Sequence, residues 1–184
     1  MRLFIAITLN PEIQKELNSL QERFVSFEGI RWIKSQNIHL TLKFLGEVNE
    51  QKISLIKQAM QKAGKGISPF SANFVGLGVF PNLKAPRVIW IGIASEKEVV
   101  IIQQRLEKEL EIFGFSPEKR KFQPHLTLGR VKLLQDKKGF TKEIKELEQV
   151  SLSSKLSVDK IELIKSNLSP EGAVYSSVHK CRLE

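Results

Sequence analysis

The sequence predicts an α+β fold that is bilobal and pseudo-symmetric, with two mainly antiparallel sheets facing a central cleft and helices on the outside. Three observations predict it. Several strand-like segments follow one another without a helix between them, which favours hairpins over a doubly wound parallel sheet. Four segments are predicted helices, and two of them have the three-and-four apolar spacing of a buried helix face. The tetrapeptide His-Leu-Thr-Leu occurs twice, at residues 39–42 and 125–128, each time in a predicted strand that precedes a helix.

The first half of the chain alternates strands and helices. Residues 3–9 are continuously apolar and predict a buried strand, and Asn10 followed by Pro11 is typical of a helix start. The apolar residues of this helix recur on one face, and we expect Gly29 to end it. A strand of about eight residues that contains the first motif and a helix over about residues 49–63 follow.

The second half begins with a predicted hairpin, because residues 70–80 alternate in polarity and residues 87–94 are almost continuously apolar. Ser95 and Glu98 form an S-x-x-E capping box at the start of a helix with a long apolar face. The second motif strand, a short helix near residues 141–147 and two closing strands complete the chain.

The composition is that of a globular protein, with 184 residues, 41% hydrophobic and 27% charged. We expect one domain over residues 1–184, made of two similar lobes with one H-x-T-x motif in each, and a monomer. The longest apolar runs fall far short of the roughly 20 residues of a membrane span, and no cleavable signal is evident. The expected compartment is therefore the cytoplasm. The single cysteine, Cys181, cannot form an internal disulfide or a multi-cysteine metal site.

The net charge of +9 favours a polyanionic partner, and it is unevenly distributed. Between Glu118 and Lys145 there are nine Lys and Arg residues against three acidic ones, an excess of six around the second motif. A solvated basic surface without a ligand is the alternative interpretation.

The two motifs place histidine and threonine on one face of each strand. Because side chains alternate along a strand, His39 and Thr41 share one face, His125 and Thr127 share one face, and the leucines point the other way. Two imidazoles facing a cleft offer a neutral base and a protonated acid near pH 7. Such a pair suits in-line displacement at phosphorus, with the threonine hydroxyls donating to phosphate oxygens. No metal is required.

Other site types fit the sequence less well. A zinc site built on His39 and His125 lacks a third good ligand, since His179 lies in a different context and no H-E-x-x-H or cysteine cluster is present. A Ser/His/Asp hydrolase would need a nucleophile motif such as G-x-S-x-G, which is absent. The glycines of GKG and GLG are predicted turn or strand residues, because no nucleotide fingerprint surrounds them.

The chain resembles the two-histidine (2H) phosphoesterase superfamily. The resemblance is carried by the H-x-T-x motifs in WIKSQNIHLTLKFLGEV and FQPHLTLGRV, the opening MRLFIAI, the internal RVIWIGI and the closing LSPEGAVY. Within that superfamily it is similar to the bacterial and archaeal RNA 2′,3′-cyclic phosphodiesterases, also called 2′-5′ RNA ligases. The resemblance implies hydrolysis of an RNA 2′,3′-cyclic phosphate to a 2′-phosphomonoester without a cofactor, and reversible 2′-5′ RNA ligation as an additional activity.

The resemblance also implies roles for the motif residues. It assigns His39 as the proton donor to the leaving O3′ and His125 as the proton acceptor from water, although the sequence itself does not distinguish these two roles. Thr41 and Thr127 would hold the phosphate. The substrate would be RNA with a cyclic phosphate end or a small cyclic nucleotide.

By the same resemblance, Phe44 would stack on the terminal base and Arg130 would contact the phosphate. Each lies five residues after its motif histidine, so in a regular strand it would face the core, and contact with the cleft requires a bend or bulge. A core aromatic is the alternative for Phe44. Trp32, Trp90 and Tyr175 are interpreted as packing residues.

A non-catalytic module that binds RNA ends remains the alternative function, with the histidines gripping phosphate. The basic segment motivates it. For an RNA substrate, we expect a basic track leading to the cleft, lined by Lys119, Arg120, Lys121, Lys137 and Lys138.

Overall fold

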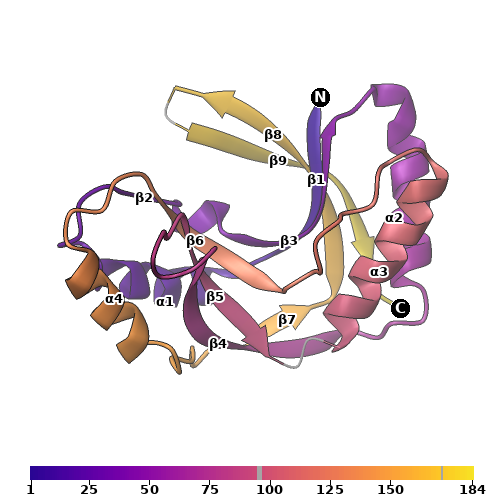
Figure 1. Cartoon of the computed structure of the whole chain (residues 1–184). Coiled ribbons are helices and arrows are strands. Elements are labelled where there is room, and N and C mark those ends of the chain that lie inside the picture. The colour runs from indigo at the N-terminus through magenta and orange to yellow at the C-terminus, as the bar shows by residue number, and fades with distance from the viewer. Residues whose placement is uncertain (95–96, 171) are drawn as a thin grey trace.

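The computed structural model describes residues 1–94, 97–170 and 172–184. Within these ranges the chain forms four α-helices and nine strands, and every strand pairing is antiparallel (Figure 1). The helices are α1 (Pro11–Glu22), α2 (Ile53–Gly64), α3 (Lys97–Ile112) and α4 (Lys137–Glu146). The strands are β1 (Arg2–Thr8), β2 (Ile30–Trp32), β3 (His39–Glu47), β4 (Phe70–Phe80), β5 (Val88–Ala94), β6 (His125–Val131), β7 (Leu156–Val158), β8 (Lys160–Ser169) and β9 (Gly172–Arg182).

The strands form one curled sheet in the order β7-β4-β5-β6-β3-β1-β8-β9, with β2 paired to β6. We call β1, β3, β8 and β9 the β1 half, and β2, β4, β5, β6 and β7 the β5 half. A single residue pair, Leu40 with Leu126, joins β3 to β6 and therefore joins the halves. Helices α2 and α3 lie against the β1 half, and α1 and α4 lie at the opposite end of the molecule (Figure 1).

The α+β class is confirmed, and the arrangement of the motif strands differs in one respect from the prediction. The two sheets expected to face each other are parts of one sheet, in which β3 and β6 are neighbours. A sheet twists between successive strands, so a sheet of this size can curl until its two halves enclose a hollow. No helix within the described residues is long and apolar enough to cross a membrane.

Most predicted elements form where the apolar pattern places them. The Asn10 side chain accepts a hydrogen bond from the Ile13 amide and caps α1, and the predicted hairpin pairs Phe80 with Val88. Helix α1 ends at Glu22, earlier than expected, because the segment before Gly29 continues as turns. The aromatic residues of those turns pack on Phe140 of α4 and thus keep the predicted burial.

Four features depart from the expected elements or lie beyond the described residues. The short strand β2 was not predicted, since three residues are too few to show a period. The first of the two predicted closing strands is divided into β7 and β8 at Asp159. Helix α4 begins at Lys137 because Asp136 caps it through a hydrogen bond from the Gly139 amide. The capping box predicted at Ser95 lies outside the described residues.

A β-bulge interrupts each motif strand at the same position. In β3, Leu42 has no partner in β1, because the register steps from Thr41 opposite Ala6 to Lys43 opposite Ile5. In β6, Leu128 is the extra residue in the same way, since Thr127 lies opposite Trp90 and Gly129 opposite Ile89. An extra residue reverses the alternation of the side chains that follow. Lys43 and Gly129 are accordingly buried, and Phe44 and Arg130 are exposed.

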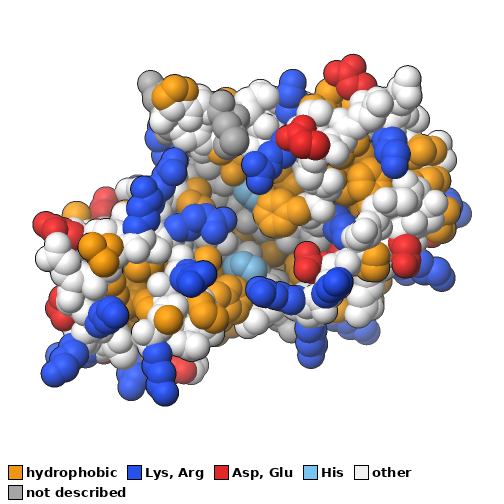
Figure 2. All heavy atoms as spheres, turned by 45° about the horizontal axis from the view of Figure 1, so that its top comes forward, with side chains coloured by type: hydrophobic (Ala, Val, Ile, Leu, Met, Phe, Trp, Pro, Cys, Tyr) orange, Lys and Arg blue, Asp and Glu red, His pale blue; other side chains and the backbone are white. Residues whose placement is uncertain are grey.

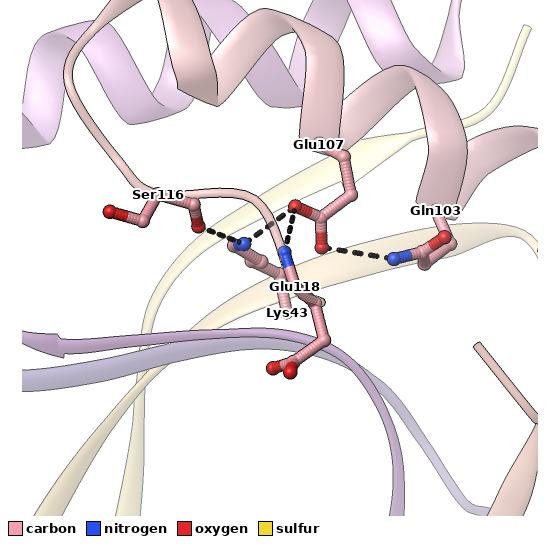
Figure 3. Close-up of polar contacts among 5 residues, drawn as sticks. All are labelled: Lys43, Gln103, Glu107, Ser116 and Glu118. Atoms are coloured by element: carbon pink, nitrogen blue, oxygen red, sulfur yellow. Dashed lines mark hydrogen bonds and ion pairs between the residues drawn. The ribbon is translucent and has the colours of Figure 1, made fainter. Parts of the chain in front are cut away.

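The lysine buried by the first bulge is held by a polar network (Figure 3). The Lys43 ammonium, whose side chain is only 6% exposed, donates to the Glu107 carboxylate of α3 at 2.6 Å and to the Ser116 carbonyl at 2.7 Å. Glu107 also accepts from the Gln103 side chain and the Glu118 amide. The network thus joins the bulge of β3 to α3 and to the loop that leads into β6.

We predict that Lys43→Met lowers the free energy of unfolding by about 3 kcal/mol or more, because it leaves the Glu107 carboxylate of this buried pair without its partner. Urea unfolding measures this change. The matched control is Lys62→Met, which breaks the exposed 2.9 Å pair with Glu109 and should cost about 1 kcal/mol or less. Equal costs for the two variants would contradict a structural role for the Lys43 pair.

Candidate active site

The pair of Leu40 and Leu126 is the centre of a local pseudo-twofold arrangement. In an antiparallel pair, the residues that flank one partner lie beside those that flank the other, so His39 lies toward Thr127 and Thr41 toward His125. Both leucines are buried, and all four flanking side chains are half-buried on the opposite face. His39 and His125 are diagonal neighbours across this pair. In a regular sheet diagonal neighbours lie about 7–8 Å apart, which leaves room for a phosphate group between the two imidazoles.

The four side chains open into a hollow between the two halves. Figure 2 shows histidine atoms within this hollow and Lys and Arg side chains gathered around it. The structure thus brings together the four motif residues that the sequence singled out.

The same backbone contact orients each imidazole. Nδ1 of His39 lies 2.8 Å from the Asn37 carbonyl oxygen, and Nδ1 of His125 lies 2.6 Å from the Gln123 carbonyl oxygen. Because a carbonyl oxygen only accepts, each Nδ1 carries a proton and donates it. Each Nε2 is then the nitrogen that changes its protonation state, as a base or an acid requires.

Aromatic rings hold His39 on its other sides. Phe4 of β1 stacks on the imidazole with ring centroids 4.7 Å apart, and Tyr175 of β9 meets it edge-on at 5.4 Å. The Asn37 side chain donates to the Ala173 carbonyl of β9, so the residue that orients His39 also holds the β8–β9 hairpin against the site. The ring of His39 is therefore fixed by contacts from three separate segments.

His125 has an equivalent support in the β5 half. Phe80 meets its ring edge-on at 5.1 Å, and Phe80 itself stacks on Trp90. The Trp90 indole lies over Gly78, where a Cβ atom would come within 2.4 Å of it. Gly78, in the GLG sequence predicted to be structural, is thus required by the close approach of this indole.

Burial controls the acidity of the site. It lowers the pKa of His39 and of His125 below the ordinary value, and the hydrogen bond of each Nδ1 to a carbonyl works in the opposite direction. Burial raises the pKa of Tyr175, while Arg130 and Arg2 oppose that change, which places two cations near the phenol. Both histidines therefore favour the neutral form in the free protein.

The bulges decide where Phe44 and Arg130 lie. Each follows its bulge and is exposed, Phe44 by 66%, on the strand face that carries the motif histidine. The ring centroid of Phe44 lies 6.1 Å from that of Phe4, the ring that stacks on His39. Phe44 is therefore not a core aromatic. Contact with the cleft requires a bend or bulge. Both strands have one, before Phe44 in β3 and before Arg130 in β6.

The residues that support the imidazoles were not predicted from the sequence. Phe4 belongs to a continuously apolar strand, so alternation could not show which face it occupies. Tyr175 and Trp90 were interpreted as packing residues, and they do pack, but each packs against a motif histidine. A signal for Tyr175 was available in part, since it ends LSPEGAVY, one of the segments that carried the family resemblance. Among the described residues, no group of three His, Cys, Asp or Glu side chains could hold a metal ion.

The sequence matches the family model described as LigT like Phosphoesterase, over residues 7–90 and again over residues 91–175. The chain belongs to this LigT-like phosphoesterase family. The predicted membership of the two-histidine phosphoesterases is therefore confirmed.

Relatives of this LigT-like phosphoesterase match along its whole length. A Thermotoga maritima protein named RNA 2′,3′-cyclic phosphodiesterase is 37% identical over 185 residues, covering 100% of this chain and 96% of the relative. One of the same name from Methanothermobacter thermautotrophicus is 33% identical over 184 residues, covering 100% and 99%. The crystal structure of TT0787 of Thermus thermophilus has a TM-score of 0.85 at 28% identity and covers 100% of this chain and 98% of that one. The fold of Escherichia coli LigT is also similar, with a TM-score of 0.81 at 22% identity over 99% and 96% of the two chains.

We predict that the imidazole resonances of His39 and His125 titrate below pH 6.5 in NMR spectra of the free protein, with assignments from His39→Gln and His125→Gln. The unfolded chain then takes up these protons at higher pH than the native one. The stabilising contribution of neutral histidine is complete above about pH 6.5 and is lost as the pH falls through the folded pKa. Midpoints at or above 6.5 would contradict the dominance of burial.

Proposed function

We propose that this protein hydrolyses RNA 2′,3′-cyclic phosphate ends to 2′-phosphomonoesters without a metal cofactor. The observation that carries the proposal is the paired arrangement of His39 and His125, each with Nδ1 bound to a carbonyl and Nε2 left to react. The names of the relatives from Thermotoga maritima and Methanothermobacter thermautotrophicus support the same reaction.

In the proposed mechanism, the cyclic phosphate lies between the two imidazoles. Neutral His125 accepts a proton from water at Nε2 as the water oxygen attacks phosphorus, and the P–O3′ bond breaks in line with the attack. Protonated His39 donates its Nε2 proton to O3′, while the P–O2′ bond remains. The product carries a 2′-phosphate and a 3′-hydroxyl, and proton exchange with solvent restores both histidines.

The threonines and Arg130 would stabilise the charge on the non-bridging oxygens. Thr41 and Thr127 flank the joining pair on the same face as the histidines, so their hydroxyls can donate to a phosphate from both strands. Arg130 would add a positive charge on the strand face of His125 and Thr127. These donors supply the electrostatic stabilisation that the transition state needs.

The same chemistry extends to 2′-5′ ligation if an RNA 5′-hydroxyl replaces water as the attacking group. We further propose that residues 1–184 act as one domain of two similar lobes, as a monomer in the cytoplasm. The two successive matches to the family model support an origin of the lobes as a repeat.

We predict that His39→Ala and His125→Ala each lower kcat/KM for a nucleoside 2′,3′-cyclic phosphate by about 10²–10⁴-fold, because each removes one proton transfer. His179→Ala, at the third histidine, is the control and should retain activity within a few-fold. Wild-type turnover should persist in EDTA. Loss of turnover on chelation, restored by zinc, would contradict metal independence. Binding of the cyclic phosphate without any product would instead support the RNA-end-binding alternative.

A substrate with sulfur in place of O3′ separates the roles of the two histidines. A thiolate is a better leaving group than an alkoxide, so its departure depends less on a proton donor. The defect of His39→Ala should shrink on this substrate, whereas the defect of His125→Ala should remain. The opposite pattern would reverse the assignment of acid and base while leaving the paired mechanism intact.

We predict that Phe44→Ala raises KM for a cyclic nucleotide by about 5- to 100-fold with little change in kcat, because base stacking on an aromatic contributes about 1–3 kcal/mol. Phe44→Tyr keeps an aromatic face and should stay near wild type. Ribose 2′,3′-cyclic phosphate, which has no base, should be insensitive to Phe44→Ala. Equal losses on both substrates would mean that Phe44 supports the strand and not the base.

A further inference from the structure

A basic groove lies beyond Arg130, at the end of the site formed by the β5 half. Its volume is about 640 Å³, and it is bounded by the edges of β2 and β6, the β4–β5 turn and the start of α4. None of the described residues that line this groove is acidic. The basic ones are Arg31, Lys84, Arg87, Arg130, Lys132 and Lys137.

One residue, Arg130, belongs both to the basic groove and to the strand face of the candidate active site. Arg130 follows the bulge of β6 and therefore lies on the strand face of His125 and Thr127. It also lies directly opposite Arg31 of β2 in the sheet register. From Thr127 to Arg130 the strand covers about 10 Å, so a chain of phosphates that starts at the histidines can continue into the groove.

The charges of the groove are not offset within the described part of the chain. None of the six basic side chains forms an ion pair or a side-chain hydrogen bond with a described residue, in contrast to Lys43 and Lys62. Like charges directly opposite each other destabilise a sheet, and Arg31 and Arg130 are such a pair. A negatively charged ligand would offset this repulsion.

We propose that the basic groove binds the sugar–phosphate backbone of the RNA strand that carries the cyclic phosphate. The inference rests on the proposed function. Several cations in an open groove suit a ligand with repeated phosphates, because binding releases the counterions of each one. Leu133, which lines the groove and is 71% exposed, offers an apolar contact for a ribose or a base.

This path differs from the basic track expected from the sequence. The charged segment is divided by β6, with Lys119, Arg120 and Lys121 on the loop before the strand and the other basic residues at its far end. Lys137 lines the basic groove, whereas Lys138 lines a separate hollow on α4 together with Lys142 and Lys145. The lining of the basic groove does not include Lys119, Arg120, Lys121 or Lys138. It includes three cations from more distant parts of the sequence, Arg31, Lys84 and Arg87.

The test compares two triple variants with equal charge change. The groove variant carries Lys84→Ala, Arg87→Ala and Lys132→Ala, and the control variant carries Lys138→Ala, Lys142→Ala and Lys145→Ala. The substrates are an oligoribonucleotide with a 2′,3′-cyclic phosphate end and the corresponding mononucleotide. We expect the groove variant to raise KM for the oligonucleotide at least about 10-fold and to leave mononucleotide turnover within a few-fold, with little change in the control.

Direct binding keeps the groove testable apart from hydrolysis. Fluorescence anisotropy with an oligonucleotide ending in a 2′-phosphate should show that the groove variant weakens binding and lowers the salt slope by about 2, or roughly 0.7 for each lost contact. Unchanged affinity and slope, or equal losses in the control variant, would overturn the proposal. So would groove-dependent binding of a nucleoside triphosphate without groove-dependent binding of the oligonucleotide. Absence of hydrolysis in the wild type would overturn the proposed function alone, since the binding result stands independently.

Discussion

The pairing of Leu40 with Leu126 organises the whole site. It is the one residue pair that joins β3 to β6, and it places a histidine and a threonine from each half of the sheet around a common centre. Burial of both leucines fixes which face the four polar side chains occupy, because alternation leaves them no other side. A shift of one residue in either strand would turn the histidine and threonine of that strand into the core.

The bulge that occurs in both β3 and β6 also determines which side chains face the hollow, in a way that simple alternation along a strand would not predict. After Leu42 and Leu128 the side chains change sides, so that Lys43 and Gly129 turn inward while Phe44 and Arg130 turn toward the hollow. The inward positions are stabilised differently in the two halves. Lys43 is neutralised by Glu107, and Gly129 leaves space for the ring of Trp32.

The backbone around the site is nearly symmetric, but its side chains are not. The equivalent positions after the two bulges carry an exposed aromatic ring in one half and an exposed guanidinium in the other. An aromatic face suits a base, and a cation suits a phosphate, so the two halves offer different surfaces to the two parts of a nucleotide. Under the proposed function, this asymmetry would give an RNA end a direction in the hollow, with the basic groove on the side of Arg130.

Apolar periodicity and an exact repeat are local signals, and they were enough to predict the α+β class, most helices and strands and the four motif residues. The neighbouring positions of β3 and β6 in one sheet, the early end of α1, and the rings of Phe4, Trp90 and Tyr175 around the histidines became visible only in the folded chain. The same is true of the basic groove, which combines Arg31, Lys84 and Arg87 with residues beyond β6. These features arise from strand pairing between distant segments and from bulges, and neither leaves a period in the chain that local reasoning can detect.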